Sequence, residues 1–125
     1  MKRIFLNIKL HGAKVTQANL EYEGSISIDK YILKETGLIP FEKVDIYNIN
    51  NGERFSTYII PGKKGEIALN GAAARKVQVG DRIIIVSYIE LKEDEIKKHI
   101  PKCFILDSNN QIIKKFTYKI SLDGE

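Results

Sequence analysis

Apolar and polar residues alternate along much of this chain, which is the pattern of β-strands that bury one face. The alternation is clearest in residues 4–11. A strand with this pattern turns its apolar side chains toward a core and its polar side chains away from it. The apolar positions are Ile4, Leu6, Ile8 and Leu10, and the polar positions are Asn7, Lys9 and His11.

Turn residues divide the rest of the chain into short extended segments. Asn51-Gly52 predicts a tight hairpin turn, and Gly80-Asp81 predicts a turn before the most apolar stretch, residues 83–91. Ser108-Asn109-Asn110 predicts a further hairpin. The expected strands are residues 4–11, 25–28, 44–49, 53–60, 67–69, 83–91, 102–107 and 112–120.

Three short helical segments are expected between these strands. Asp29 is a suitable cap for the first, which runs through Thr36 and stops at Gly37. The remaining expectations are helical residues 71–77 opened by Asn70, helical residues 92–99 ended by Pro101, a loop at Pro61-Gly62 and Gly65, and a mobile tail over residues 121–125. Many short strands with two or three short helices suggest a single domain, residues 1–125, folded as a small closed β-barrel.

Composition narrows the class of protein without giving a function. The net charge is +4, and 43% of the residues are hydrophobic, as in a globular protein. No apolar run is long enough to span a membrane, and residues 1–12 do not look like a secretory signal. The single Cys103 excludes an internal disulfide and favours a reducing, cytoplasmic setting. We expect Cys103 to serve packing.

Taken singly, the chemically capable residues give weak signals. Gly24-Ser25 is common in turns, and Lys9 with His11 is most simply a polar strand face. The chain has two histidines, so a histidine-based metal site is not expected. A triad of Ser25, His11 and an aspartate lacks the nucleophile-elbow pattern, and the glycines form no common phosphate-binding loop.

Several separated motifs in order are more specific. The segments LHGAKVTQANLEYEGSISID, NGERFSTYII and NGAAARKVQVGD closely resemble the pyruvoyl-dependent aspartate 1-decarboxylases. The resemblance covers most of residues 1–90 and is loose from Leu91 onward. The matching positions are Lys9, His11, Tyr22-Glu23-Gly24-Ser25, Arg54, Thr57-Tyr58 and Asn70-Gly71-Ala72-Ala73-Ala74.

The resemblance implies a mainly β fold, a small six-stranded double-psi β-barrel with a few short helices, assembled as a homotetramer with active sites between subunits. It also implies a zymogen that cleaves itself. The Ser25 hydroxyl attacks the Gly24 carbonyl, the resulting ester undergoes β-elimination, and hydrolysis leaves a pyruvoyl group at position 25. The products are a β chain, residues 1–24, and an α chain, residues 25–125.

The implied enzyme is a cytoplasmic lyase acting on L-aspartate. The pyruvoyl ketone forms a Schiff base with the substrate amine and accepts the electrons released as CO2 leaves. The product β-alanine serves pantothenate and coenzyme A biosynthesis. Neither a metal nor pyridoxal phosphate is expected, and neither nucleic acid nor a membrane is expected as a partner.

The resemblance also implies roles for individual residues. Arg54 and Lys9 supply cations for the two substrate carboxylates, and Tyr58 donates the proton that replaces CO2. Asn70 and groups near Thr57 are candidates to stabilise the oxyanion of self-cleavage. The implied residues are Ser25 and Tyr58 for catalysis; Gly24, Ser25, Thr57 and Asn70 for processing; and Lys9, His11, Arg54, Thr57, Gly71, Ala72 and Ala73 for substrate binding.

Two departures from the family pattern and two alternative functions remain. Tyr47, which follows Asp45-Ile46, and Arg75-Lys76 differ from the residues common in the family. We expect both departures to affect surface charge and subunit contacts more than activity. The alternatives are a non-catalytic double-psi barrel that acts as a binding module, and an unprocessed, inactive relative.

Overall fold

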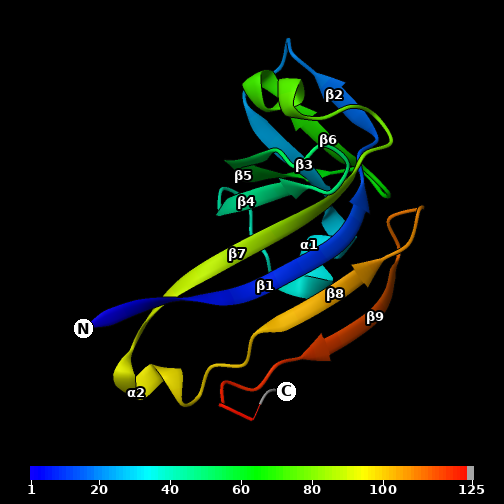
Figure 1. Ribbon diagram of the computed structural model, residues 1–125. Helices are drawn as coiled ribbons and strands as arrows, with labels where there is room; N and C mark the ends of the chain where they lie inside the picture. Colours follow the sequence, from blue (N-terminus) through cyan, green and yellow to red (C-terminus); the bar gives the residue numbers. More distant parts are fainter. Residues whose placement is uncertain (124–125) are drawn as a thin grey trace.

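The fold is built mainly from β-strands, with a few short helical segments between them (Figure 1). The computed structural model describes residues 1–123. The elements in chain order are β1 (Lys2–Lys14), β2 (Gln17–Asn19), β3 (Ser25–Asp29), α1 (Lys30–Thr36), β4 (Lys43–Asn48), β5 (Arg54–Gly62), β6 (Ile67–Asn70), the 3₁₀ helix η1 (Gly71–Lys76), β7 (Arg82–Lys92), α2 (Glu93–Ile96), β8 (Lys102–Leu106) and β9 (Ile112–Thr117).

The strands pair in the order β2-β6-β3-β5-β4-β7-β1-β8-β9. β3 lies between β6, to which it is antiparallel, and β5, to which it is parallel. β1 and β7 pair antiparallel, and their outer ends, residues 2–6 and 88–92, form a two-stranded ribbon that extends from the rest of the molecule toward the N-terminus (Figure 1). Consequently, the start of β3 and the ribbon lie in different parts of the pairing order.

A β-bulge in β1 changes which side chains reach the core. The pairing of β1 with β7 skips Asn7, so Leu6 and Ile8 point to opposite faces. The prediction of a single apolar face over residues 4–10 is therefore wrong. Ile4 is 70% exposed, whereas Leu10 is fully buried.

The boundaries predicted for α1 are confirmed. The Asp29 carboxylate accepts hydrogen bonds from the backbone N–H of Tyr31 and of Gly65, each at 2.7 Å. Gly37 ends the helix with φ 88°, in the left-handed region that glycine adopts at low cost. Asp29 thus caps the helix and also fixes the loop between β5 and β6.

The Pro61-Gly62 pair was expected in a loop, but β5 continues through it. The pairing of β5 with β4 ends at Tyr58, opposite Lys43, whereas its pairing with β3 continues, with Ile28 opposite Pro61. One edge of β5 is therefore free of β4 at Pro61, and a residue without a backbone N–H is tolerated there.

The helix predicted over residues 92–99 is shorter in the structure. α2 spans Glu93–Ile96, and hydrogen bonds from Lys98 to Glu95 and from His99 to Ile96 form single turns after it. No residue of α2 is buried. A short helix gains most of its stability by packing an apolar face, and α2 has none to extend it.

The core lies between the strands and α1. Cys103 is buried, as expected of a packing residue. β9 ends at Thr117, before the predicted residue 120, and residues 124–125 of the expected tail lie outside the described residues. The largest fully buried side chains are Phe104, Leu10, Ile26, Ile28, Ile46, Ile59, Ile67, Leu69, Ile83, Ile85, Leu106 and Val15.

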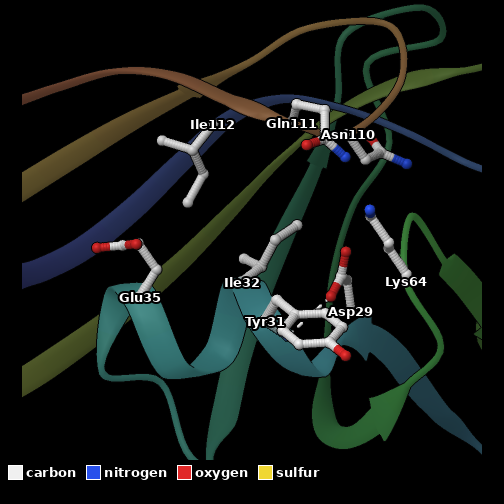
Figure 2. Close-up of a pocket in the computed structure, with 8 residues that line it drawn as sticks. All are labelled: Asp29, Tyr31, Ile32, Glu35, Lys64, Asn110, Gln111 and Ile112. Carbon is white, nitrogen blue, oxygen red and sulfur yellow. Dashed lines mark hydrogen bonds between the residues drawn. The ribbon is translucent and has the colours of Figure 1, made fainter.

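A pocket of about 220 Å³ lies between α1 and the loop that joins β8 to β9 (Figure 2). Its two buried polar side chains, those of Asn110 and Asp29, already have partners in the protein. The amide of Asn110 donates to the carbonyls of Lys14 and Gly65 and accepts from the Lys14 N–H. The carboxylate of Asp29 is held as described above. These two side chains connect distant loops, and none of the predicted site residues lines the pocket. We therefore do not take it as the candidate site.

The prediction of a mainly β domain with few short helices is confirmed. Nine strands pair in the described chain, more than the six expected for a double-psi barrel. A strand-rich domain of this size fits a barrel, but the pairing order includes no contact between its two end strands, β2 and β9, so the closed double-psi barrel stays a prediction. None of the helices in residues 1–123 has both the length and the apolar character to cross a membrane.

Candidate active site

Ser25 lies where an exposed turn meets a buried strand. The turn before it carries Tyr22, which is 63% exposed, whereas Ser25 at the start of β3 is 2% exposed. The Ser25 hydroxyl donates to the carbonyl of Glu23 at 3.3 Å. The peptide bond predicted to be cut, between Gly24 and Ser25, therefore joins a solvent-exposed turn to a buried strand.

The Asn70 side chain holds the Ser25 hydroxyl from the neighbouring strand. Asn70 is the last residue of β6 and pairs directly with Ser25. Its Nδ2 donates to Ser25 Oγ at 3.0 Å and to Ser27 Oγ at 3.1 Å. Asn70 is itself 2% exposed and does not cap η1. In this chain the amide contacts the predicted nucleophile, Ser25 Oγ.

Gly71 presses against the backbone of the turn that precedes Ser25. Its φ is 65°, and a Cβ there would lie 2.7 Å from both the Cα and the N of Gly24 and 3.0 Å from the carbonyl of Tyr22. Only glycine allows this approach. A Cβ on Gly24 would meet only the Asn70 carbonyl, at 3.9 Å. The close contact therefore requires glycine at 71, while position 24 has room.

Tyr58 belongs to the strand beside Ser25. In the parallel pairing of β3 with β5, Ile26 lies opposite Ile59, and both are fully buried. This is the first pair of the two strands, and the residues immediately before it are Ser25 and Tyr58. Because side chains alternate along a strand, both point to the face opposite the two isoleucines. The predicted nucleophile and the predicted proton donor thus immediately precede the first paired residues of two neighbouring strands.

Other residues of this region surround Tyr58 or follow Asn70 in the chain. The Tyr58 ring stacks against Phe41, with centroids 6.0 Å apart. Thr57 precedes Tyr58 on β5 and is half-buried. Ala72 and Ala73 follow in η1, where the former is exposed and the latter half-buried. We call Ser25, Asn70, Gly71, Thr57 and Tyr58 the serine group.

The remaining predicted residues lie on one face of the sheet formed by β1, β7, β4 and β5. Residues opposite one another in paired strands point to the same side. His11 pairs with Ile84, Ile84 with Tyr47, and Tyr47 with Arg54. Lys9, two residues before His11 on β1, shares its face. We call Lys9, His11, Tyr47 and Arg54 the cationic face.

Arg54 and Tyr47 are in direct contact on this face. The Arg54 guanidinium carbon lies 3.8 Å from the centre of the Tyr47 ring. The Tyr47 hydroxyl is 2.8 Å from the Tyr88 hydroxyl and donates to Asp45 at 3.4 Å. An open pocket of about 260 Å³ borders Arg54, Tyr47 and Asp45. From the sequence we expected Tyr47 to affect surface charge and subunit contacts more than activity, and its contact with a proposed substrate residue, Arg54, was not predicted.

Burial and neighbouring charges shift two pKa values on the cationic face. Desolvation, followed by the charges of Lys9 and Arg82, lowers the pKa of His11 below 6.5, so its imidazole is neutral at pH 7. Desolvation, the Tyr88 hydroxyl and the Asp45 charge raise the pKa of Tyr47 to about 12, while Arg54 opposes that rise. Tyr47 therefore keeps its proton and remains a hydrogen-bond donor.

The two groups are not joined within one chain. β1 is four positions from β3 in the strand order, and four residues along β5 separate Arg54 from Tyr58, about 13 Å in an extended strand. No hydrogen bond or ion pair in residues 1–123 links Lys9, His11 or Arg54 to Ser25. The same residues contain no group of three or more His, Cys, Asp or Glu side chains that could hold a metal ion.

Comparisons with known proteins agree with the motif pattern. The family model described as aspartate decarboxylase matches residues 1–113. The chain is 57% identical over 114 residues to the aspartate 1-decarboxylase of Hydrogenobaculum sp., covering 91% of each chain. It is 57% identical over 109 residues to that of Campylobacter hominis, covering 87% of this chain and 96% of the relative. The Bdellovibrio bacteriovorus protein of the same name is 56% identical over 110 residues, covering 88% and 89%.

The environment of His11 gives a testable pKa. We expect its NMR titration midpoint to fall below 6.5, because burial and the Lys9 ammonium both disfavour the imidazolium ion. Lys9→Met should raise the midpoint, although not fully, since desolvation is the larger cause. Lys9→Arg keeps the charge and should leave the midpoint low. A midpoint above 6.5 in the unsubstituted protein would contradict this description of the cationic face.

Proposed function

This chain belongs to the aspartate decarboxylase family, and from that premise we propose that it converts L-aspartate to β-alanine and CO2 with a pyruvoyl group made from its own Ser25. The activity follows from family membership, which does not favour the alternative of a non-catalytic binding module. One observation carries the proposal for Ser25. Its buried hydroxyl, at the end of an exposed turn, receives a hydrogen bond from the Asn70 amide.

The proposed self-processing uses groups of the serine group. Ser25 Oγ attacks the Gly24 carbonyl carbon, and the acyl group moves from the Ser25 nitrogen to its oxygen. β-Elimination then breaks the Cβ–Oγ bond, releases residues 1–24 with a carboxylate on Gly24, and leaves dehydroalanine at 25. Addition of water and loss of ammonia give the pyruvoyl end of residues 25–125. The Asn70 amide orients the attacking oxygen, and backbone groups near Thr57 are candidates for the oxyanion.

The surroundings of Ser25 fit a small ketone at this position. Asn70 Nδ2 provides a donor, and the fixed approach of Gly71 closes one side. When formed, a pyruvoyl group supplies an electron sink for the electrons released with CO2. The protein's own part is to hold the substrate, exclude water and deliver a proton. We assign the proton delivery to the Tyr58 hydroxyl, which shares a strand face with position 25.

The substrate carboxylates require cations that the serine group lacks. Arg54 offers a bidentate contact and Lys9 a point charge, while the neutral His11 can add a hydrogen bond. Because these residues lie away from Ser25 in one chain, we propose that a neighbouring copy supplies them. A homotetramer with active sites between subunits, the expected assembly, would satisfy this requirement.

Other parts of the proposal follow from the family. The product β-alanine would enter pantothenate and coenzyme A biosynthesis. The buried, unpaired Cys103 is consistent with a reducing cytoplasm. Gly71, Ala72 and Ala73 are proposed to border the substrate through the backbone of η1. The pyruvoyl group is proposed as the prosthetic group in place of a metal or pyridoxal phosphate.

Self-cleavage at Ser25 is tested by intact mass. We expect the purified protein to resolve into residues 1–24 and 25–125, and Ser25→Ala to stay full length and inactive, because the attacking oxygen is gone. Ser27→Ala is the matched control, since Ser27 accepts from the same Asn70 amide and is also buried; it should still cleave. Cleavage of the Ser25→Ala chain at this bond would mean that an outside protease is responsible.

The role of Tyr58 is tested by Tyr58→Phe, which keeps the ring and its contact with Phe41. Cleavage should be normal, because no step of processing uses the phenol. The rate of β-alanine formation should fall by about 10²- to 10⁴-fold, the usual contribution of general acid catalysis. Tyr31→Phe, on the exposed side of α1, should have no effect. Unchanged turnover would leave Tyr58 a packing residue, and a stalled full-length chain would assign it to maturation.

The two-subunit site is tested at a low aspartate concentration, by mixing two variants that have little or no activity there. Ser25→Ala lacks the pyruvoyl precursor and Arg54→Ala lacks the proposed carboxylate contact. Co-expressed with different tags and purified as mixed assemblies, they should regain activity at about a quarter of the sites, where a processed subunit meets an intact Arg54. Mixed assemblies no more active than their parents would show that both residues serve the same site from one chain.

A further inference from the structure

Arg54 is held on the cationic face by an aromatic ring. It lies at the start of β5 and is exposed, and the one ion pair in residues 1–123 joins Lys76 and Glu53 instead. Its guanidinium stacks on Tyr47 at 3.8 Å. An arginine that binds a carboxylate with both nitrogens needs a fixed plane, and ring stacking fixes that plane while leaving the N–H groups at the edge free to bind.

Tyr47 is in turn held by a residue that the sequence motifs do not include. Tyr88 lies on β7, and its hydroxyl is 2.8 Å from that of Tyr47. The Tyr47 hydroxyl also donates to the Asp45 carboxylate at 3.4 Å, and either tyrosine can donate in the 2.8 Å contact. These contacts link Tyr88, Tyr47 and Asp45 and connect β7 with β4.

We propose that Tyr88, acting through Tyr47, is a positioning residue that orients the Arg54 guanidinium for a carboxylate of the substrate. The inference rests on the proposed substrate role of Arg54. Tyr88 itself is 43% exposed and need not touch the substrate. Its hydroxyl fixes the direction of the Tyr47 ring, and the ring fixes the guanidinium plane beside the pocket of about 260 Å³ that Arg54 lines.

The hydrogen bond from Tyr47 to Asp45 has a second consequence. A tyrosine that donates a hydrogen bond to a carboxylate has a more electron-rich ring. A cation over the ring face is attracted by that electron density. Asp45 thus favours the stacked position of Arg54, although it makes no hydrogen bond or ion pair with Arg54 in residues 1–123.

The test is steady-state kinetics of fully processed enzyme carrying Tyr88→Phe, Tyr47→Phe or both. Each single substitution should raise KM for aspartate by about two- to ten-fold, the range for loss of one hydrogen bond, with kcat unchanged. The double variant should be no worse than Tyr47→Phe, because both remove the same link. Tyr47→Leu removes the ring as well and should raise KM by about ten-fold or more. Tyr47→Trp, which restores an aromatic face, should recover part of that loss.

The Arg54→Ala background separates this inference from the function on which it rests. Arg54→Ala alone should raise KM strongly, and adding Tyr88→Phe to it should change nothing further. If Arg54→Ala leaves KM unchanged, the proposed role of Arg54 fails. If Arg54→Ala raises KM but Tyr88→Phe does not, only the positioning role is overturned. A Tyr88→Phe effect that persists without Arg54, or one confined to kcat, would also overturn it.

Discussion

The antiparallel pairing of β3 with β6 is the constraint on which the candidate site depends. It sets Ser25 opposite Asn70, so that a buried amide can hold the serine hydroxyl. It also carries Gly71 to within van der Waals contact of the turn before Ser25, an approach that any side chain at 71 would block. β5 on the other side of β3 then adds Tyr58. A buried hydroxyl with a fixed donor has one orientation, which is what an intramolecular attack requires.

The sequence correctly predicted those elements whose ends are fixed by hydrogen bonds and backbone angles of residues close in the chain. The Asp29 cap and the Gly37 stop of α1 depend on residues within a turn of the helix, and the structure confirms them. The errors fall where distant partners decide. The bulge at Asn7 depends on the register with β7, and the continuation of β5 through Pro61 depends on where β4 stops pairing. Neither can be read from the alternation of residues along one strand.

The candidate site residues were predicted from the resemblance to a known family, because the alternation of polar and apolar residues does not identify them. Alternation identifies a polar face containing Lys9 and His11, but it gives no reason to connect that face with Ser25. Tyr47 was noticed as a departure from the family, yet its contacts were not predictable, because Tyr88 lies 41 residues away and meets it only through the pairing of β4 with β7. This network, like the errors in the strand predictions, depends on pairing between strands that are distant in the sequence.

The division of the site into two groups suggests an order of events. In the proposed mechanism, self-cleavage uses the serine group alone, whereas substrate binding also uses cations from the cationic face. A carboxylate moved from water into a protein site without a cation loses much hydration energy, so aspartate has little affinity for the serine group by itself. If a neighbouring subunit brings the cations, maturation can proceed in each chain independently, while decarboxylation begins only where two chains meet. Assembly then controls catalysis through charge, with no change required in the fold of either chain.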